Sequence, residues 1–213
     1  MSRHPFLTQE SRKRLVRAVE SVEARSAAEV VIAVKPWSAR YWYVDHILAA
    51  WTSYAALAFM MWSDTAFSLT AIVVGTITTY LTIWGVVFLL RSLRRWLIPA
   101  RILDDETRKA ARAQFVKMGV MRTRDRSGIL VFVSLLEQRV WAVPDIGVTD
   151  SLGKEKWNIL DQGIRRAIAD HGVGPAGVEA LAKAIEAMVS DMEVALPRRA
   201  DDVNELADFA EAD

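Results

Sequence analysis

The stretch "RVWAVPDIGVTDSLGKEKW" (Arg139–Trp157) decides how the rest of the chain is interpreted. A run of β-branched and aromatic residues ends in Pro144-Asp145-Ile146-Gly147, and a helical pattern follows it. In α/β proteins, ligands commonly bind at the ends of strands, so a carboxylate beside a glycine at such a point is a candidate site. Asp145 is therefore either a catalytic or cation-binding group or the residue that turns the chain.

The segments around this stretch predict a small α/β domain. The near-continuous apolar run Glu29–Lys35 indicates a strand that is covered on both faces. The runs "GILVFVSL" and "RVWAVPD", separated by Leu136-Glu137-Gln138, predict a β-hairpin. Helical spacing of apolar residues predicts helices from Thr8 to about Arg25, from Asp104 to about Val120, over Lys154–Asp170 and over Ala176–Val194. The order of elements predicts the α/β fold class, with helices on both faces of a three-layer sandwich.

Two apolar segments, Val44–Trp62 and Ala66–Leu90, lie between the first strand and the hairpin. Crossing a hydrocarbon core takes about 20 apolar helical residues, so the pair predicts a two-helix transmembrane hairpin over residues 44–90. The hairpin would interrupt a single domain made of residues 1–40 and 97–196, because the strand before it needs neighbours that come after it. Residues 197–213 are predicted to be an acidic, disordered tail.

Basic residues flank both apolar segments, while the short connection between them carries only Asp64. The positive-inside rule therefore predicts a multi-pass protein with both termini in the cytoplasm. The cluster after the second segment is expected to contact anionic lipid headgroups rather than nucleic acid. The residues in that cluster are Arg91, Arg94 and Arg95.

Small residues recur at helical spacing in both apolar segments. Ala71, Gly75 and Thr79 share a face of the second segment, and Ala49 and Ser53 share a face of the first. Small residues at this spacing let helix backbones approach closely in lipid. They are interpreted either as holding the hairpin together or as docking it against another membrane protein.

Several kinds of chemistry are excluded by what the sequence lacks. The chain has no cysteine and a formal net charge of +1, so thiolate chemistry is absent and charge gives no reason to expect nucleic-acid binding. The "HGVGPAG" segment matches G-x-G-x-x-G but follows a helix instead of a strand, which predicts a helix–helix connection. An aspartate-nucleophile phosphatase loop is disfavoured because Gly147 stands where its second Asp belongs.

One polar site remains a candidate. Asp145, with Asp150 and Glu29 nearby, could hold a hard divalent cation such as calcium, helped by carbonyls of the Asp-x-Gly turn. The alternative is that Asp145 only closes the turn by binding nearby amides.

Three stretches carry a resemblance to a known family. They are "SAAEVVIAV" (26–34), "RSGILVFVSLLEQRVWAVPDIGV" (126–148) and "PRRADDVNEL" (197–206). Together they resemble the TPM domain family, in its bacterial branch with a transmembrane insertion, over residues 8–35 and 104–206. The sequence departs from the family at Ala28, where glycine is usual, and at "VPDIG", where an A-D-x-G form is usual.

The resemblance implies a Rossmann-like α/β/α sandwich and a location in the bacterial inner membrane. It also implies links to acid phosphatase activity, calcium binding, or assembly of membrane complexes. Asp145, Gly147 and Glu29 lie on positions of the family motifs, but the acidic residues linked to phosphatase activity in the family are not matched in this sequence. We expect a non-enzymatic accessory or assembly protein that acts on an integral membrane complex through protein contacts. A membrane-tethered metal-dependent phosphatase and a calcium-binding domain without catalysis are the alternatives.

Overall fold

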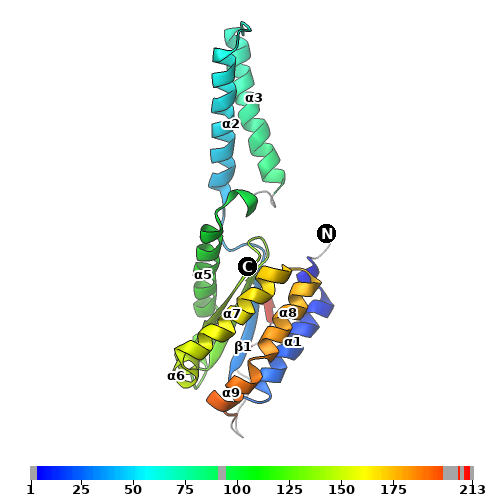
Figure 1. Cartoon of the computed structure of the whole chain (residues 1–213), viewed down its shortest axis with the longest axis vertical. Helices are drawn as coiled ribbons and strands as arrows, with labels where there is room; N and C mark the ends of the chain where they lie inside the picture. Colours follow the sequence, from blue (N-terminus) through cyan, green and yellow to red (C-terminus); the bar gives the residue numbers. More distant parts are fainter. Residues whose placement is uncertain (1–3, 91–94, 199–205, 207–208, 212–213) are drawn as a thin grey trace. The chain divides into compact units, whose positions relative to one another are not determined.

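The computed structural model describes residues 4–90, 95–198, 206 and 209–211 and has a mixed α/β fold (Figure 1). Its contacts divide the chain into two compact units. The first unit comprises Met1–Ser38 and Asp104–Asp213, and the second comprises Ala39–Leu103. The predicted α/β class is confirmed, and each unit is described separately below.

The first unit is built on a four-stranded mixed sheet with the order β3-β2-β1-β4. The strands are β1 (Glu29–Lys35), β2 (Gly128–Ser134), β3 (Arg139–Pro144) and β4 (Phe209–Glu211). β1 pairs in parallel with β2 and with β4, whereas β2 and β3 form an antiparallel hairpin. The predicted first strand and the predicted hairpin are confirmed. Both central strands are almost wholly buried, as their continuous apolar sequences require.

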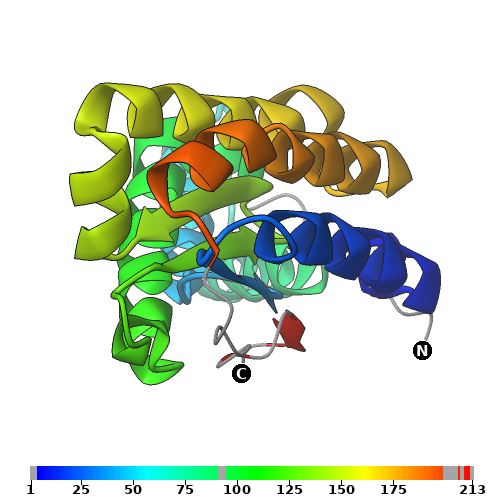
Figure 2. The same cartoon turned by 90° about the horizontal axis from the view of Figure 1, so that it is seen from below.

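Apolar side chains pack on both faces of this sheet. One cluster joins the sheet to α1 (Gln9–Glu23), α7 (Lys154–His171), α8 (Pro175–Glu186) and α9 (Val189–Ala195). A smaller cluster on the other face contains residues from α5 (Ala100–Lys117). Figure 2 shows α7 and α8 side by side on the first of these faces. Alternate residues of each strand point to opposite faces, so both faces need a cover of this kind.

The start of α1 follows from its capping residue. The side chain of Thr8 accepts a hydrogen bond from the backbone N–H of Ser11 at 3.2 Å, which satisfies one of the free amides of the first turn. Leu15, Val19 and Val22 then repeat at helical spacing and are fully buried against the sheet. The predicted cap and the predicted buried face are both present.

Two helical features differ from the sequence prediction. The single helix expected over Ala176–Val194 is divided into α8 and α9, because Met188 N–H bonds to Ile185 O in a tighter turn. The residues at the break keep helical backbone angles, so the apolar rhythm continues through it and gave no sign of a division. A short helix, α6 (Ile146–Leu152), also begins directly after Asp145 where only a turn was expected.

The tail also differs in part. Phe209–Glu211 pairs with Ile32–Val34 of β1, although this segment was predicted to be disordered. The Phe209 ring is buried, and the guanidinium of Arg12 lies 5.0 Å from its centre, so one aromatic residue anchors the short strand. Most other residues of the predicted tail beyond Arg198 lie outside the described residues.

The second unit contains the antiparallel pair α2 (Trp42–Trp62) and α3 (Leu69–Leu89). Ser53 Oγ donates to the backbone oxygen of Thr76 at 2.9 Å, and His46 Nδ1 lies 2.7 Å from Tyr80 Oη. Both contacts cross from one helix to the other, in addition to the apolar packing between them. The two helices therefore form a hairpin of their own.

The membrane prediction needs correction. Within the described residues, only α3 is long and apolar enough to cross a membrane. α2 fails this test because its 21 residues include Asp45, His46 and several hydroxyl and indole side chains. The predicted multi-pass protein of the bacterial inner membrane, with both termini in the cytoplasm, is therefore wrong.

Candidate functional site

Asp145 lies between β3 and α6 and caps the helix. Its Oδ1 accepts the Ile146 N–H at 2.7 Å, and its own N–H donates to the Gly128 carbonyl at 2.8 Å. The residue is only 5% exposed. A carboxylate at the first turn of a helix also interacts favourably with the free amides there. Asp145 thus has the geometry of the turn-closing residue that was one of its two interpretations.

The rest of the Asp145 carboxylate is occupied by Arg126. Arg126 Nε lies 2.9 Å from Oδ2 and Nη2 lies 3.2 Å from Oδ1, a two-point pairing of guanidinium and carboxylate. Hydrogen bonding to Asp145, and then its negative charge, raises the pKa of Arg126. The negative charge of the Asp145 carboxylate is therefore balanced by Arg126 within the protein.

Gly147 is required by a close approach of two backbones. A Cβ at this position would lie 2.4 Å from the Asp125 oxygen and 2.7 Å from the Arg126 oxygen. The Gly147 N–H donates to that same Arg126 oxygen at 3.1 Å. The glycine lets the start of α6 pack against the loop that carries Arg126.

Asp145 also lies beyond the strand ends opposite to those where α/β proteins usually bind ligands. Glu29 is paired with Gly128 at the beginning of β1 and β2, and Pro144 at the end of antiparallel β3 is paired with Ile129. The turn is therefore at the amino ends of the parallel strands. Ligands of α/β sheets bind outside the carboxyl ends. The sequence predicted the hairpin of β2 and β3, but the end of the sheet at which Asp145 lies follows only from the parallel pairing of β2 with β1.

The other proposed cation ligands do not complete a site. Glu29 is 7% exposed at the start of β1, and Asp150 is exposed on α6. Over the described parts of the chain, no group of three His, Asp or Glu side chains is arranged to hold a metal ion. The Asp-x-Gly geometry is instead accounted for by the cap, the Arg126 pair and the glycine contact.

A buried polar cluster lies at the carboxyl ends of β1 and β2. Glu137 follows β2 and is fully buried; its carboxylate accepts the Ser38 N–H at 2.8 Å and also the hydroxyl of Ser134. Ser38 Oγ in turn donates to Thr107 Oγ1 at 3.4 Å. These residues connect the segment after β1, the β2–β3 turn and α5. The sequence analysis treated Glu137 as part of a hairpin loop, and no local pattern distinguishes it from an exposed turn residue.

The small residues of the second unit divide between the helix contact and the surface. Ala49 is fully buried and Ser53 is 7% exposed where α2 meets α3. A Cβ on Gly75 would lie 2.5 Å from the end of the Met60 side chain, so this glycine also faces α2. Thr79 is half-buried and its hydroxyl donates to the Gly75 oxygen, whereas Ala71 is exposed. Three of the five residues, Ala49, Ser53 and Gly75, thus lie in or beside the contact between the helices.

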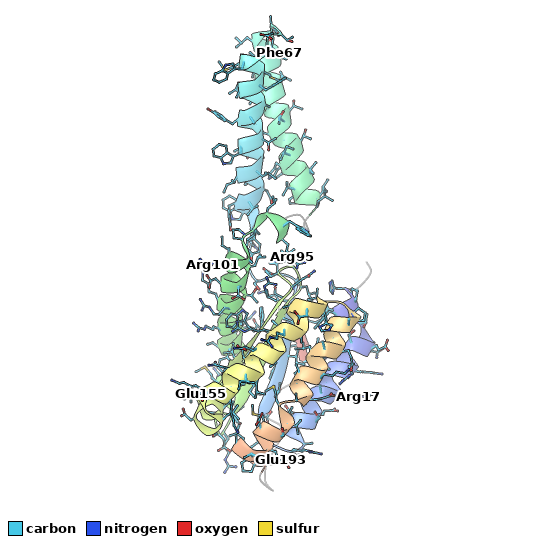
Figure 3. The ribbon with its side chains drawn as sticks, in the orientation of Figure 1. Arg17, Phe67, Arg95, Arg101, Glu155 and Glu193 are labelled. Carbon is cyan, nitrogen blue, oxygen red and sulfur yellow. The ribbon has the colours of Figure 1, made fainter. Side chains whose placement is uncertain are left out.

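The outer surface of α2 and α3 is strongly apolar. Figure 3 shows side chains extending outward along both helices. Exposed fractions reach 69% for Trp51, 88% for Trp62 and 79% for Leu69. Soluble monomers rarely expose apolar patches larger than a few hundred Å². This surface is the largest unexplained feature of the second unit. Of the basic residues expected beside it, Arg95 is half-buried, and Arg91 and Arg94 lie outside the described residues.

Comparison with known proteins places the fold only. No family model and no curated protein matches this chain. Among solved structures, the chain is similar to the BA42 protein of the psychrophilic bacterium Bizionia argentinensis, determined by NMR, with a TM-score of 0.58 and 13% identity over 99% of each chain. Similarity at this level of identity concerns the fold alone, and the resemblance to the TPM domain family stays a prediction.

Proposed function

We propose that the chain is a non-enzymatic accessory protein of a membrane complex, in which α2 and α3 provide attachment and the α/β unit makes protein contacts. The observation that carries this proposal is the exposed apolar surface of α2 and α3. Within the same proposal, the α/β unit is a three-layer Rossmann-like sandwich of the TPM domain type.

The size of the apolar surface supports attachment to an apolar environment. Burying one large apolar side chain is worth roughly 1.5–3 kcal/mol, and many such side chains of α2 and α3 are exposed. Ile47, Trp51 and Tyr54 lie on α2, and Val73, Ile77 and Leu81 lie on α3, all at least half exposed. Soluble proteins rarely keep so much apolar surface in water, which favours burial of this surface against lipid or an apolar partner. Arg95, with Arg91 and Arg94, would contact anionic headgroups beside it.

The two buried carboxylates are already bonded to other groups of the protein, which favours a role in protein binding over catalysis. Asp145 is paired with Arg126 and caps α6, and Glu137 is buried and accepts two hydrogen bonds. A phosphatase mechanism or a calcium site at Asp145 would first have to separate this carboxylate from Arg126. No contact of the described residues favours either alternative over a role in protein binding.

The test is purification of the full chain from native membranes in mild detergent, followed by identification of proteins present in equal amount. The proposal expects the chain in the membrane fraction together with such a partner. Leu81→Arg, on the exposed face of α3, should release the chain from membranes, while Lys154→Glu, at the start of α7, should leave it bound. Recovery of the wild-type chain in the aqueous fraction, or in detergent with no partner, would contradict the proposal.

A further inference from the structure

The two edges of β1 have unequal strand neighbours. β2 pairs with all seven residues of β1, whereas within the described residues three of them, Ile32–Val34, pair with β4 on the other side. Figure 2 shows β4, in red, beside β1. The edge of β1 that carries β4 is named the outer edge. Sheet edges of this kind can take an extended segment of another protein as an added strand.

One side chain anchors β4 to the outer edge. The Phe209 ring is buried and belongs to the larger apolar cluster, which joins the sheet to α1. Ala210 is half-buried and Glu211 is exposed. β4 is thus held by one aromatic side chain and a short run of backbone pairing. A competing segment has to supply only the same two elements to replace it.

The charge beside the anchor indicates which segments fit. The Cζ of Arg12 lies 5.0 Å from the centre of the Phe209 ring, and Arg12 is exposed on α1. Arg12 forms no ion pair with any residue that the structure describes. The sequence around the anchor is "DFAEAD" (208–213), in which acidic residues stand on both sides of the aromatic one. The outer edge therefore suits an extended segment that has carboxylates beside an aromatic residue.

A side chain occupies the outer edge ahead of the residues that pair with β4. The Val30 N–H donates to Glu23 Oε1 at 3.1 Å. Backbone groups of a strand alternate in direction, so the N–H groups of Ile32 and Val34 point to the same edge as that of Val30. A longer strand gains the Val30 N–H once it displaces the half-buried Glu23 side chain. The edge thus offers a partner more backbone pairing than Phe209–Glu211 uses.

We infer that the outer edge of β1 is a docking site for an extended segment of a partner protein, and that β4 is the occupant which this segment replaces. The inference rests on the proposed function, which assigns protein contacts to the α/β unit. The partner's segment adds to the sheet, fills the position of Phe209 with an aromatic side chain and places a carboxylate beside Arg12. Because β4 belongs to the same chain, its high local concentration keeps weaker segments out.

The test measures binding of a fluorescently labelled peptide, "LADFAEAD" (206–213), to three chains in one detergent. The chains are wild type, a shortened chain that ends at Asp208, and Phe209→Ala, which empties the same position if the shortened chain does not fold. Both altered chains should bind the peptide about tenfold more tightly than wild type, or better, because β4 no longer competes. A peptide carrying Phe209→Ala should bind them about tenfold more weakly than the original, or worse.

Two arginines of α1 and two amides of β1 locate the bound peptide. In the shortened chain, Arg12→Glu should weaken peptide binding, whereas Arg17→Glu, at another exposed position of α1, should leave it unchanged (Figure 3). The Ile32 and Val34 amides should exchange faster in the shortened chain than in wild type. Addition of the peptide should slow them again.

The partner is tested in the complex recovered from native membranes. There the Ile32 and Val34 amides of the shortened chain should stay protected without peptide, since the partner's segment occupies the edge. Fast exchange in that complex, no peptide binding by either altered chain, or equal binding of the two peptides would overturn the inference. Self-association of wild type that Phe209→Ala removes would assign the edge to the tail of a second copy and would overturn it as well. The peptide measurement needs no membrane or partner, so its failure is distinct from failure of the proposed function.

Discussion

Arg126 holds the carboxylate of Asp145 through two hydrogen bonds, from Nε at 2.9 Å and from Nη2 at 3.2 Å. The two residues are 19 positions apart and belong to the loop before β2 and the turn after β3. The pair ties both ends of the β-hairpin segment together at the amino edge of the parallel strands. It gives Asp145 a structural role that can be measured.

Replacing Asp145 by Ala should destabilise the fold. The change removes the cap of α6, worth about 1 kcal/mol, and it also removes the partner of Arg126. Asp145→Asn keeps an acceptor for the Ile146 N–H and should cost less. Chemical unfolding of the two variants beside Asp150→Ala, an exposed position on the same helix, gives the measurement. Equal stability of Asp145→Ala and Asp150→Ala would show that the cap and the pair contribute nothing.

Two glycine-to-alanine changes should have opposite signs. At Gly147 the new Cβ would be 2.4 Å from the Asp125 oxygen, so the backbone must shift, at a cost of about 1–3 kcal/mol. At Gly163, inside α7, nothing lies within 4 Å of the new Cβ, and alanine should stabilise the helix by about 0.5–1 kcal/mol. Thermal unfolding of both variants checks the prediction. Stabilisation by Gly147→Ala would contradict the close contact.

The link between α1 and α8 should make stability depend on pH. Arg14 donates to Glu179 Oε2 at 2.8 Å, and this hydrogen bond lowers the pKa of Glu179 from its ordinary 4.5. Because the folded value is below the unfolded one, the contribution is fully present above pH 4.5 and is lost as the pH falls through the folded value.

Glu179→Gln should remove that dependence. Between about pH 5 and pH 3, the variant should lose less of its free energy of unfolding than the wild type does. Glu155→Gln, at an exposed position near the start of α7, is the control and should follow the wild-type curve. Parallel curves for wild type and Glu179→Gln would mean that the Arg14 contact does not contribute to stability.

Glu137 should tolerate little change. Its carboxylate accepts the Ser38 N–H and the Ser134 hydroxyl in a fully buried setting. Glu137→Ala leaves both donors without this acceptor, and each buried unpaired group costs about 1–3 kcal/mol. Urea unfolding compared with Glu20→Gln, on the exposed side of α1, measures the loss. A difference below about 0.5 kcal/mol would refute the proposed role of the buried cluster.

Much of the fold could be predicted from the sequence because its signals are local. The apolar runs of β1 and β2 and the cap at Thr8 each depend on a few consecutive residues. Gly172 and Gly174 likewise end α7 and begin α8, as the helix–helix interpretation of "HGVGPAG" predicted. β4 was missed because three residues inside an acidic segment carry no periodicity.

The candidate site was harder to predict from the sequence than the fold, because it depends on contacts between residues far apart in the chain. Whether Asp145 is free or paired depends on Arg126, and the burial of Glu137 depends on Ser38, 99 positions away. The direction of β3 relative to β1 decides at which ends of the parallel strands the carboxylates of Asp145 and Glu137 lie. Local patterns fix strands and caps, but these long-range contacts exist only once the sheet has formed.

The hydrogen bond between Ser38 and Thr107 has a consequence for engineering. The first segment of the α/β unit ends at Ser38, and its second segment begins at Asp104. The hydroxyl oxygens of Ser38 and Thr107 are 3.4 Å apart. Each added residue can extend a linker by up to about 3.5 Å, so a bridge of a few residues could replace residues 39–103 without stretching the sheet. The same junction could accept a foreign insert whose ends lie close together, making the α/β unit a carrier for grafted segments.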